Sequence, residues 1–320
     1  MFPQVRSLTA DDLGIEAGVV ADDVEPLPDA AVEADTRKPI VIPANDPILE
    51  LVRTAISDGY GGVIFVGPPG TSKSWYGIQI ARFLVGDDPA RYRTIQFHPS
   101  YQYEDFMEGY VPTGGGSFEL KDKQFLELCK HARANSSNLY VMVIDEISRC
   151  DAARVFGEAL TYLESSRRGE VFQLPSGRTC DIPQNLFVIA TMNPWDRGVD
   201  DVDMALERRF AKIQMDPNPA LLDKLLTANG VDAALRKRVT DFFAMLLRHP
   251  NTYCHIGHAY FMRVTDSKSL DRLWQFQLKA HLSKALRLDS AGFESIEAAW
   301  TRVVTEPTHT EATPRSAERG

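Results

Sequence analysis

The chain has 320 residues, of which 44% are hydrophobic and 25% charged, and its formal net charge is −9. This length and composition allow a full hydrophobic core. The negative charge excludes a globally basic nucleic-acid-binding surface, so contact with DNA would need a local patch or a partner. No apolar run approaches the roughly 20 residues that cross a bilayer, and no secretory signal is evident, so we expect a cytoplasmic protein without a membrane segment. No Cys-x-x-Cys spacing occurs, and free thiols are expected at Cys129, Cys150, Cys180 and Cys254.

Acidic residues, alanine and proline dominate residues 1–40. Such a segment cannot bury enough apolar surface to offset the entropy lost on ordering, so we expect it to be flexible. The same reasoning applies to residues 305–320.

Residues 41–217 alternate short apolar runs with amphipathic stretches. The runs are rich in β-branched residues and span residues 63–66, 94–97, 140–144, 186–190 and 210–215. Runs of this kind are typical of strands buried on both faces, and the amphipathic stretches 74–84 and 124–133 are expected to be crossover helices. The pattern predicts an α/β domain, with a parallel sheet covered by helices on both faces.

After Pro219 the strand pattern stops. Apolar residues then recur at three-to-four spacing, as in Leu221, Leu222, Leu225 and Leu226, which predicts helices. We expect a small all-α domain over residues 218–304.

A glycine-rich segment connects the first predicted strand to the first helix. Its sequence, Gly-Pro-Pro-Gly-Thr-Ser-Lys-Ser, is typical of a loop whose backbone N–H groups and helix N-terminus bind phosphate. Lys73 would add a positive charge, and the Ser74 hydroxyl would bind Mg²⁺. Ser72 stands where such loops usually have glycine; if the position needs a positive φ, serine carries a modest penalty. The residues assigned to nucleotide binding are Gly67, Pro68, Pro69, Gly70, Thr71, Ser72, Lys73, Ser74 and Trp75.

Two carboxylates follow the apolar run 140–144. We assign Asp145 to the metal and Glu146 to the attacking water, which it would orient or deprotonate. By itself the pair could equally cap the following helix.

Polar side chains also flank the next two predicted strands, after the fourth and before the fifth. Asn193 is expected beside the γ-phosphate, where it would orient the lytic water. Arg208 and Arg209 precede the last strand; in a ring assembly one of them would reach the nucleotide of the neighbouring subunit, although a solvated arginine pair is the alternative.

These four elements, in this order, resemble the AAA+ ATPases with their P-loop nucleotide-binding fold. Three further segments are similar to the McrB-type family, the motor subunits of methylation-dependent restriction systems within the dynein-related and MoxR-like branch. These are residues 97–112, the Met-Asn-Pro-Trp-Asp-Arg sequence at 192–197, and Ile-Gly-His-Ala-Tyr-Phe at 256–261 in the predicted lid domain.

The resemblance implies a homo-oligomeric ring, expected to be a hexamer, that hydrolyses ATP or GTP with Mg²⁺ and drives a partner nuclease or effector in anti-phage defence. DNA would be contacted through the partner or the ring pore. It also implies that Asp196 and Arg197 join Asn193 in the catalytic centre. Known methyl-DNA-directed members carry a separate N-terminal recognition domain. In this sequence only an acidic segment of about 40 residues precedes the motor, so target recognition would reside elsewhere.

Several interpretations stay open at the level of sequence. A MoxR-like chaperone that remodels a protein client would use the same phosphate chemistry, and a module that only binds nucleotide is a third hypothesis. Residues 171–183 suggest a hairpin before the fourth predicted strand. Packing is preferred over metal binding for His255 and His258, and over base stacking for the aromatic residues of 101–110. Arg263 is a weaker candidate for a phosphate sensor.

Overall fold

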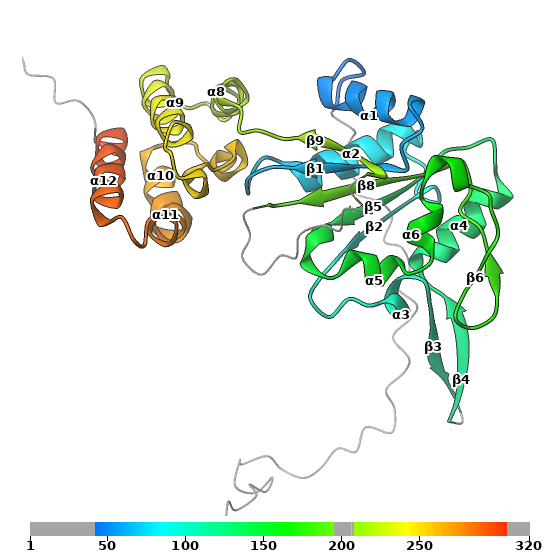
Figure 1. Ribbon diagram of the computed structural model, residues 1–320. Helices are drawn as coiled ribbons and strands as arrows, with labels where there is room; N and C mark the ends of the chain where they lie inside the picture. Colours follow the sequence, from blue (N-terminus) through cyan, green and yellow to red (C-terminus); the bar gives the residue numbers. More distant parts are fainter. Residues whose placement is uncertain (1–41, 115, 195–205, 207, 306–320) are drawn as a thin grey trace, which may run out of the picture. The chain divides into compact units, whose positions relative to one another are not determined.

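A computed structural model describes residues 42–114, 116–194, 206 and 208–305 (Figure 1). Its centre is a five-stranded parallel sheet with the strand order β2-β5-β8-β1-β9. The strands are β1 (Gly62–Val66), β2 (Tyr92–Gln96), β5 (Tyr140–Asp145), β8 (Leu186–Met192) and β9 (Phe210–Gln214). All five predicted strands are present, and the predicted fold class is confirmed.

The sheet separates two hydrophobic clusters because successive side chains of a strand point to opposite faces. In β1, Val63 and Phe65 pack in the cluster under α1 (Pro47–Ser57) and α2 (Lys73–Leu84). Ile64 packs on the other face, under α4 (Gln124–Ala134), α5 (Ala152–Phe156) and α6 (Ala159–Tyr162). Figure 1 shows these two helix layers on either side of the sheet. Burial on both faces explains the nearly continuous apolar runs.

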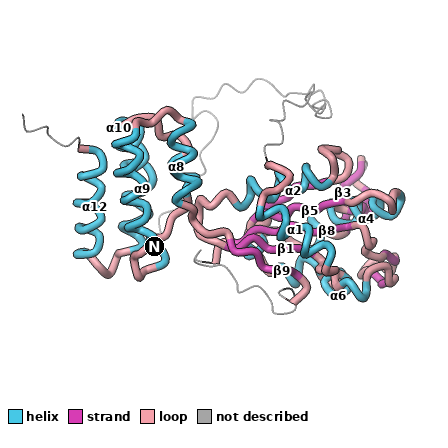
Figure 2. The backbone as a smooth tube through the Cα atoms, turned by 90° about the horizontal axis from the view of Figure 1, so that it is seen from above, coloured by secondary structure: helices cyan, strands magenta, loops and turns pink. Residues whose placement is uncertain are grey.

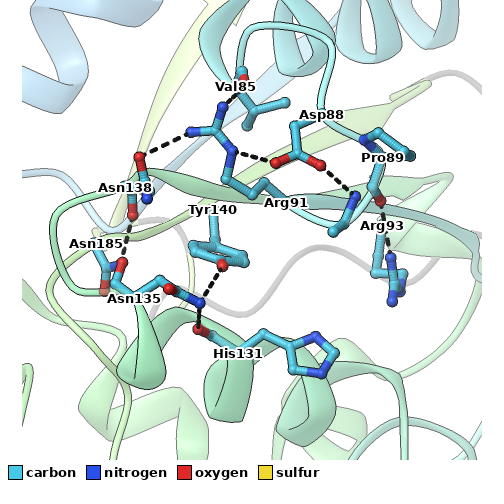
Figure 3. A network of polar contacts seen from close by, with 11 residues as sticks. Val85, Asp88, Pro89, Arg91, Arg93, His131, Asn135, Asn138, Tyr140 and Asn185 are labelled. Carbon is cyan, nitrogen blue, oxygen red and sulfur yellow. Dashed lines mark hydrogen bonds and ion pairs between the residues drawn. The ribbon is translucent and has the colours of Figure 1, made fainter.

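Polar caps fix the ends of the covering helices. Asp46 begins α1 by accepting hydrogen bonds from the backbone N–H groups of Ile48 and Leu49, with Pro47 in the first turn. At the end of α4, the Asn185 side chain donates to the carbonyl oxygens of Ala132, Asn135 and Asn138. Figure 3 shows Asn185 beside Asn135 and Asn138. Asn185 precedes β8, so it also connects this helix end to the amino-terminal edge of the sheet.

Two hairpins accompany the sheet. The sequence predicts the smaller one, and the structure confirms it as β6 (Phe172–Gln173) paired with β7 (Thr179–Cys180). The larger one, β3 (Glu108–Thr113) paired with β4 (Ser117–Asp122), follows the short helix α3 (Tyr103–Phe106) and was not predicted.

The aromatic residues before the larger hairpin are mostly packed. Phe106 is fully buried, with its ring centroid 4.9 Å from those of Phe125 and Phe156, and Tyr101 stacks on Phe97 at 4.8 Å. Tyr110 differs, because it lies on β3 and is 70% exposed.

The remaining residues form a helical region with its own core. Its helices are α8 (Pro219–Ala228), α9 (Ala233–Leu247), α10 (Ser267–Leu273), a π-helical stretch (Trp274–Leu278), α11 (Lys279–Ala285) and α12 (Ser290–Val304). Figure 2 shows α8 beside α9 and α9 beside α12, and contacts between these helices agree. Within this core Trp274 stacks on Trp300, and Phe242 meets Trp300 edge to face. The predicted all-α region after the sheet is therefore present.

No helix in the described ranges is both long and apolar enough to span a membrane.

Candidate phosphate-binding site

The site lies where three neighbouring strands end. Strands β5, β8 and β1 are adjacent and parallel, so their carboxyl ends meet at one edge of the sheet. The backbone N–H of Gly67, just after β1, lies 3.4 Å from the carbonyl oxygen of Met192 at the end of β8. A pocket of about 410 Å³ opens at this edge, lined by Pro69, Gly70, Ser72, Lys73, Ser74, Trp75, Glu146, Arg149, Asn193 and Ala259.

The loop between β1 and α2 is held by its own side chains. The buried Thr71 hydroxyl donates to the carbonyl oxygen of Pro68 at 3.0 Å. The Lys73 ammonium donates to the carbonyl oxygens of Gly67 and Pro68, both at 2.8 Å. Helix α2 begins at Lys73, so its N-terminal N–H groups and its positive dipole end face the same pocket. The loop thus presents the backbone donors and the cation that a phosphate requires.

Ser74 and Asp145 come together from different elements. The Ser74 hydroxyl donates to Asp145 Oδ1 at 2.6 Å, and Thr191 on β8 donates to the same oxygen at 2.5 Å. No group of three or more acidic, histidine or cysteine side chains that could hold a metal occurs among the described residues. Mg²⁺ commonly uses one or two protein oxygens and completes its shell with water and phosphate, so Ser74 and Asp145 fit Mg²⁺ bound together with a nucleotide.

Thr191 contacts both acidic residues of the site and was not identified from the sequence. Besides contacting Asp145, its hydroxyl oxygen accepts a hydrogen bond from the backbone N–H of Glu146 at 3.1 Å. It is 1% exposed and therefore fixes both acidic residues from within the core. The available signal was a hydroxyl side chain in an otherwise apolar run.

Glu146 lines the pocket in a left-handed backbone conformation, with φ 58° and ψ 47°. Its carboxylate forms an ion pair with Arg149 at 3.2 Å. Asn193 is 6% exposed and also lines the pocket, as predicted from its place after β8. Trp75 lies at the rim with 42% of its surface exposed. Asp196 and Arg197 lie outside the described residues.

Arg208 and Arg209 do not join this site. They precede β9, and the carbonyl oxygen of Arg209 accepts from the N–H of Gly61 at the amino-terminal edge of the sheet. The length of strand β1 separates that edge from the loop between β1 and α2, which we call the phosphate loop. At ~3.3 Å per residue this length is about 15 Å. Arg209 is 7% exposed and ion-paired with Glu164 at 3.7 Å, whereas Arg208 is exposed.

The helical region contacts the phosphate loop directly. The N–H groups of Gly257 and Ala259 donate to the carbonyl oxygens of Pro69 and Gly70, each at 2.9 Å. A Cβ atom on Gly257 would lie 1.9 Å from the Gly70 carbonyl, so only glycine allows this approach. The 256–261 segment, which carries part of the family resemblance, therefore packs on the loop, and we call it the lid segment.

Ser72 has φ 66° and ψ 23°, the left-handed conformation whose cost the sequence analysis anticipated. Its hydroxyl lies 3.3 Å from Nε2 of His258 in the lid segment. His258 is 4% exposed, and burial lowers its pKa. The other histidine of the predicted pair, His255, contacts the carbonyl oxygen of His249 at 2.9 Å, so the two imidazoles have separate partners.

Arg263 lines a different pocket, of about 310 Å³, within the helical region. Its neighbours there include Arg272, Phe276 and Gln277. Arg263 is not among the residues that line the pocket at the phosphate loop.

Comparisons with known proteins agree with this geometry. Residues 62–210 match the model of the AAA domain, dynein-related subfamily. The chain is 33% identical over 230 residues to the type IV methyl-directed restriction enzyme EcoKMcrB subunit of Escherichia coli K12, an alignment that covers 66% of this chain and 50% of that protein. It is 28% identical over 188 residues to the type II restriction enzyme BsuMI component YdiS of Bacillus subtilis 168, covering 46% and 55%. The chain thus spans about half the length of these curated relatives.

A solved structure described as a candidate ATPase of Cytophaga hutchinsonii is 18% identical, with coverage of 73% of this chain and 67% of that one. Its TM-score is 0.36.

Proposed function

We propose that this chain, which belongs to the AAA+ proteins of the McrB type, hydrolyses a nucleoside triphosphate as the motor subunit of a DNA restriction system. One observation carries the proposal: a phosphate loop with Lys73, a Ser74–Asp145 oxygen pair and Glu146 line one pocket at the carboxyl edge of the sheet. The two relatives belong to restriction enzymes and are named a subunit and a component, which supports a partner protein.

The residues divide the work of phosphoryl transfer to water. Backbone N–H groups of the loop and the start of α2 bind the phosphates, and Lys73 neutralises their charge. Ser74 and Asp145 would hold Mg²⁺, which offsets the charge that builds up on the phosphate oxygens. Glu146 accepts a proton from the attacking water or orients it, and Asn193 positions that water from the neighbouring strand. Thr191 holds the Asp145 carboxylate and the Glu146 backbone in place through its two hydrogen bonds. By family resemblance, Asp196 and Arg197 belong to the same centre.

A guanidinium from another subunit would complete the site. Of the two candidates, exposure favours Arg208, because Arg209 is buried and paired with Glu164. This assignment requires a homo-oligomeric ring, which we propose to be a hexamer with nucleotide at each subunit interface. The partner is proposed to be a nuclease or other effector, with DNA contacted through it or through the pore, in the cytoplasm.

The test is hydrolysis of ATP and of GTP with Mg²⁺ by the wild-type chain and by Glu146→Gln. We expect the variant to lose about 10² to 10⁴ of the turnover, since general-base contributions have that size, while it still binds nucleotide. Glu170→Gln is the matched control, because Glu170 is an exposed partner of Arg167 away from the pocket.

Omission of Mg²⁺ should abolish hydrolysis by the wild type as well. The proposal fails if Glu146→Gln turns over as fast as Glu170→Gln. If a protein client stimulates hydrolysis and DNA with a nuclease does not, the motor is a chaperone and not a restriction subunit.

A further inference from the structure

The Ser72 hydroxyl occupies an unusual place in the pocket. Ser72 lines the pocket beside Lys73 and Ser74, at the last position of the loop before α2. Its left-handed backbone conformation would suit glycine without strain. A serine here therefore costs backbone energy and adds one hydroxyl to the phosphate-binding surface.

The contact with His258 determines which way that hydroxyl points. A neutral imidazole carries one N–H, and its two nitrogens have different surroundings here. Nε2 lies 3.3 Å from the Ser72 oxygen, whereas Nδ1 is buried without a hydrogen-bond partner in the described structure. Leaving a buried N–H donor unsatisfied is costly, so the tautomer with the proton on Nε2 is favoured.

In that tautomer His258 donates and the Ser72 oxygen accepts. The hydroxyl proton of Ser72 is then free to point elsewhere, and the pocket is the polar space that Ser72 faces. A hydroxyl aimed at a phosphate oxygen makes a charge-assisted hydrogen bond.

The contact also joins two parts of the chain. Ser72 belongs to the loop of the sheet domain and His258 to the lid segment, which is clamped to the loop by the Gly257 to Pro69 and Ala259 to Gly70 hydrogen bonds. The orientation of the Ser72 hydroxyl thus depends on the lid segment being seated on the loop.

We propose that Ser72 is a phosphate-binding residue whose hydroxyl is aimed at the nucleotide by His258, so that phosphate affinity depends on the seating of the lid segment. The inference rests on the proposed function and deepens it. His258 is a positioning residue that acts through Ser72 and does not itself touch the nucleotide.

The experiment is calorimetric titration of the 320-residue chain with non-hydrolysable analogues of ATP and GTP in the presence of Mg²⁺. Ser72→Ala removes the hydroxyl, and we expect affinity to fall about tenfold, the value of one hydrogen bond to a charged group. Ser72→Gly also removes the hydroxyl and should lose about as much affinity, because the strain that it relieves is present with and without nucleotide and therefore changes the melting temperature and not the affinity.

Two substitutions at His258 separate orientation from packing. His258→Gln can place an N–H near the position of Nε2 and should stay within about twofold of wild type, whereas His258→Asn is too short to reach and should lose about as much as Ser72→Ala. Ser72→Ala combined with His258→Asn should lose no more than either single change, because both remove the same hydrogen bond. His255→Asn is the matched control, since the His255 imidazole contacts the carbonyl oxygen of His249, whereas Ser72 is contacted by His258.

The outcomes separate the two proposals. If the wild type binds neither analogue, the proposed function fails. If both Ser72 variants bind the analogues as tightly as the wild type does, the inference is wrong while the function stands. The same holds if the losses of affinity at Ser72 and His258 multiply in the double variant. Melting temperatures of all variants show which have folded, and the comparison of Gln with Asn at position 258 decides the case if Ser72→Ala does not fold.

Discussion

Strain is concentrated in the residues around the pocket. Three non-glycine residues among those described have positive φ, and two of them, Ser72 and Glu146, line it. Such conformations cost on the order of 1 kcal/mol each and persist where neighbouring contacts fix them. Glu146 is fixed by Thr191 and Ser72 by the start of α2 and His258. These side chains thus hold positions that a relaxed backbone would not give them.

The buried side chain of Arg168 joins several segments at the amino-terminal edge of the sheet, opposite the pocket. Arg168 is 8% exposed and donates to the carbonyl oxygens of Leu163, Pro183, Leu186 and Gly61 at 2.7 to 3.2 Å. Burial lowers the pKa of Arg168 to about 10, so the group stays charged at neutral pH. Its partners are neutral carbonyls, so their alignment compensates for the lost hydration of the guanidinium.

Arg168→Met should therefore lower the free energy of unfolding by about 3 kcal/mol or more, because four carbonyls lose their donor. Arg168→Lys should not restore it, since one ammonium cannot reach all four oxygens. Urea denaturation measures both, with the half-exposed Arg167→Met as the control. A loss below about 1 kcal/mol would mean that water replaces the guanidinium.

At the scale of elements, Glu108 joins the two hairpins. It begins β3, is 4% exposed, and accepts from Ser176 and Arg178 of the β6–β7 hairpin, with the closest Arg178 nitrogen at 2.6 Å. Arg178 also pairs with Asp122 at the end of β4 at 2.8 Å. Burial by itself would raise the pKa of Glu108, but the hydrogen bonds from Arg178 and Ser176 outweigh it and hold the pKa below its usual value.

Because the folded pKa of Glu108 is lowered, its contribution is present above about pH 4.5 and is lost as the pH falls through the folded pKa. Glu108→Gln should remove this part of the acid sensitivity and cost about 1 to 2 kcal/mol at neutral pH. Hydrogen exchange should become faster in β6–β7 as well as in β3–β4. Exposed Glu119→Gln is the control; unchanged exchange in β6–β7 would show that the hairpins are independent.

At the scale of the whole molecule, the sheet separates the phosphate loop from the two arginines. The loop follows the carboxyl end of β1, and Arg208 and Arg209 lie beside its amino end. The chain cannot fold its own Arg208 onto its own nucleotide without breaking the sheet. Arg208 can contribute to hydrolysis only across an interface between copies.

Mixing two inactive variants tests this. Arg208→Ala keeps an intact pocket, and Lys73→Ala keeps an intact arginine, so each alone should show little turnover. In an equal mixture about a quarter of the interfaces would combine an intact pocket with an intact arginine, and about that fraction of the wild-type rate should return. Mixing Arg209→Ala with Lys73→Ala shows whether Arg209 serves instead. No recovery in either mixture contradicts an arginine supplied by a neighbour.

The sequence by itself determined the strands of the main sheet, the helical region and most of the pocket. Short apolar runs rich in β-branched residues are typical of strands covered on both faces, and the residues that follow them must lie at one edge if the strands are parallel and adjacent. Asp145 and Asn193 needed no more than that, whereas Lys73 and Ser74 also needed the glycine-rich pattern of residues 67–74. The β3–β4 hairpin gave a weak signal because exposed strands lack an apolar run, and Tyr110 was misjudged as packed for the same reason.

Only the tertiary structure decided which distant residues support the site. Thr191 on Asp145, His258 on Ser72 and Gly257 on Pro69 are contacts between segments that lie 46, 186 and 188 residues apart. It also distinguished exposed Arg208 from buried Arg209, which are neighbours in the chain. Local pattern fixes the type of an element, whereas these contacts depend on how elements pack, and a single buried hydroxyl or glycine leaves no periodic trace in the sequence.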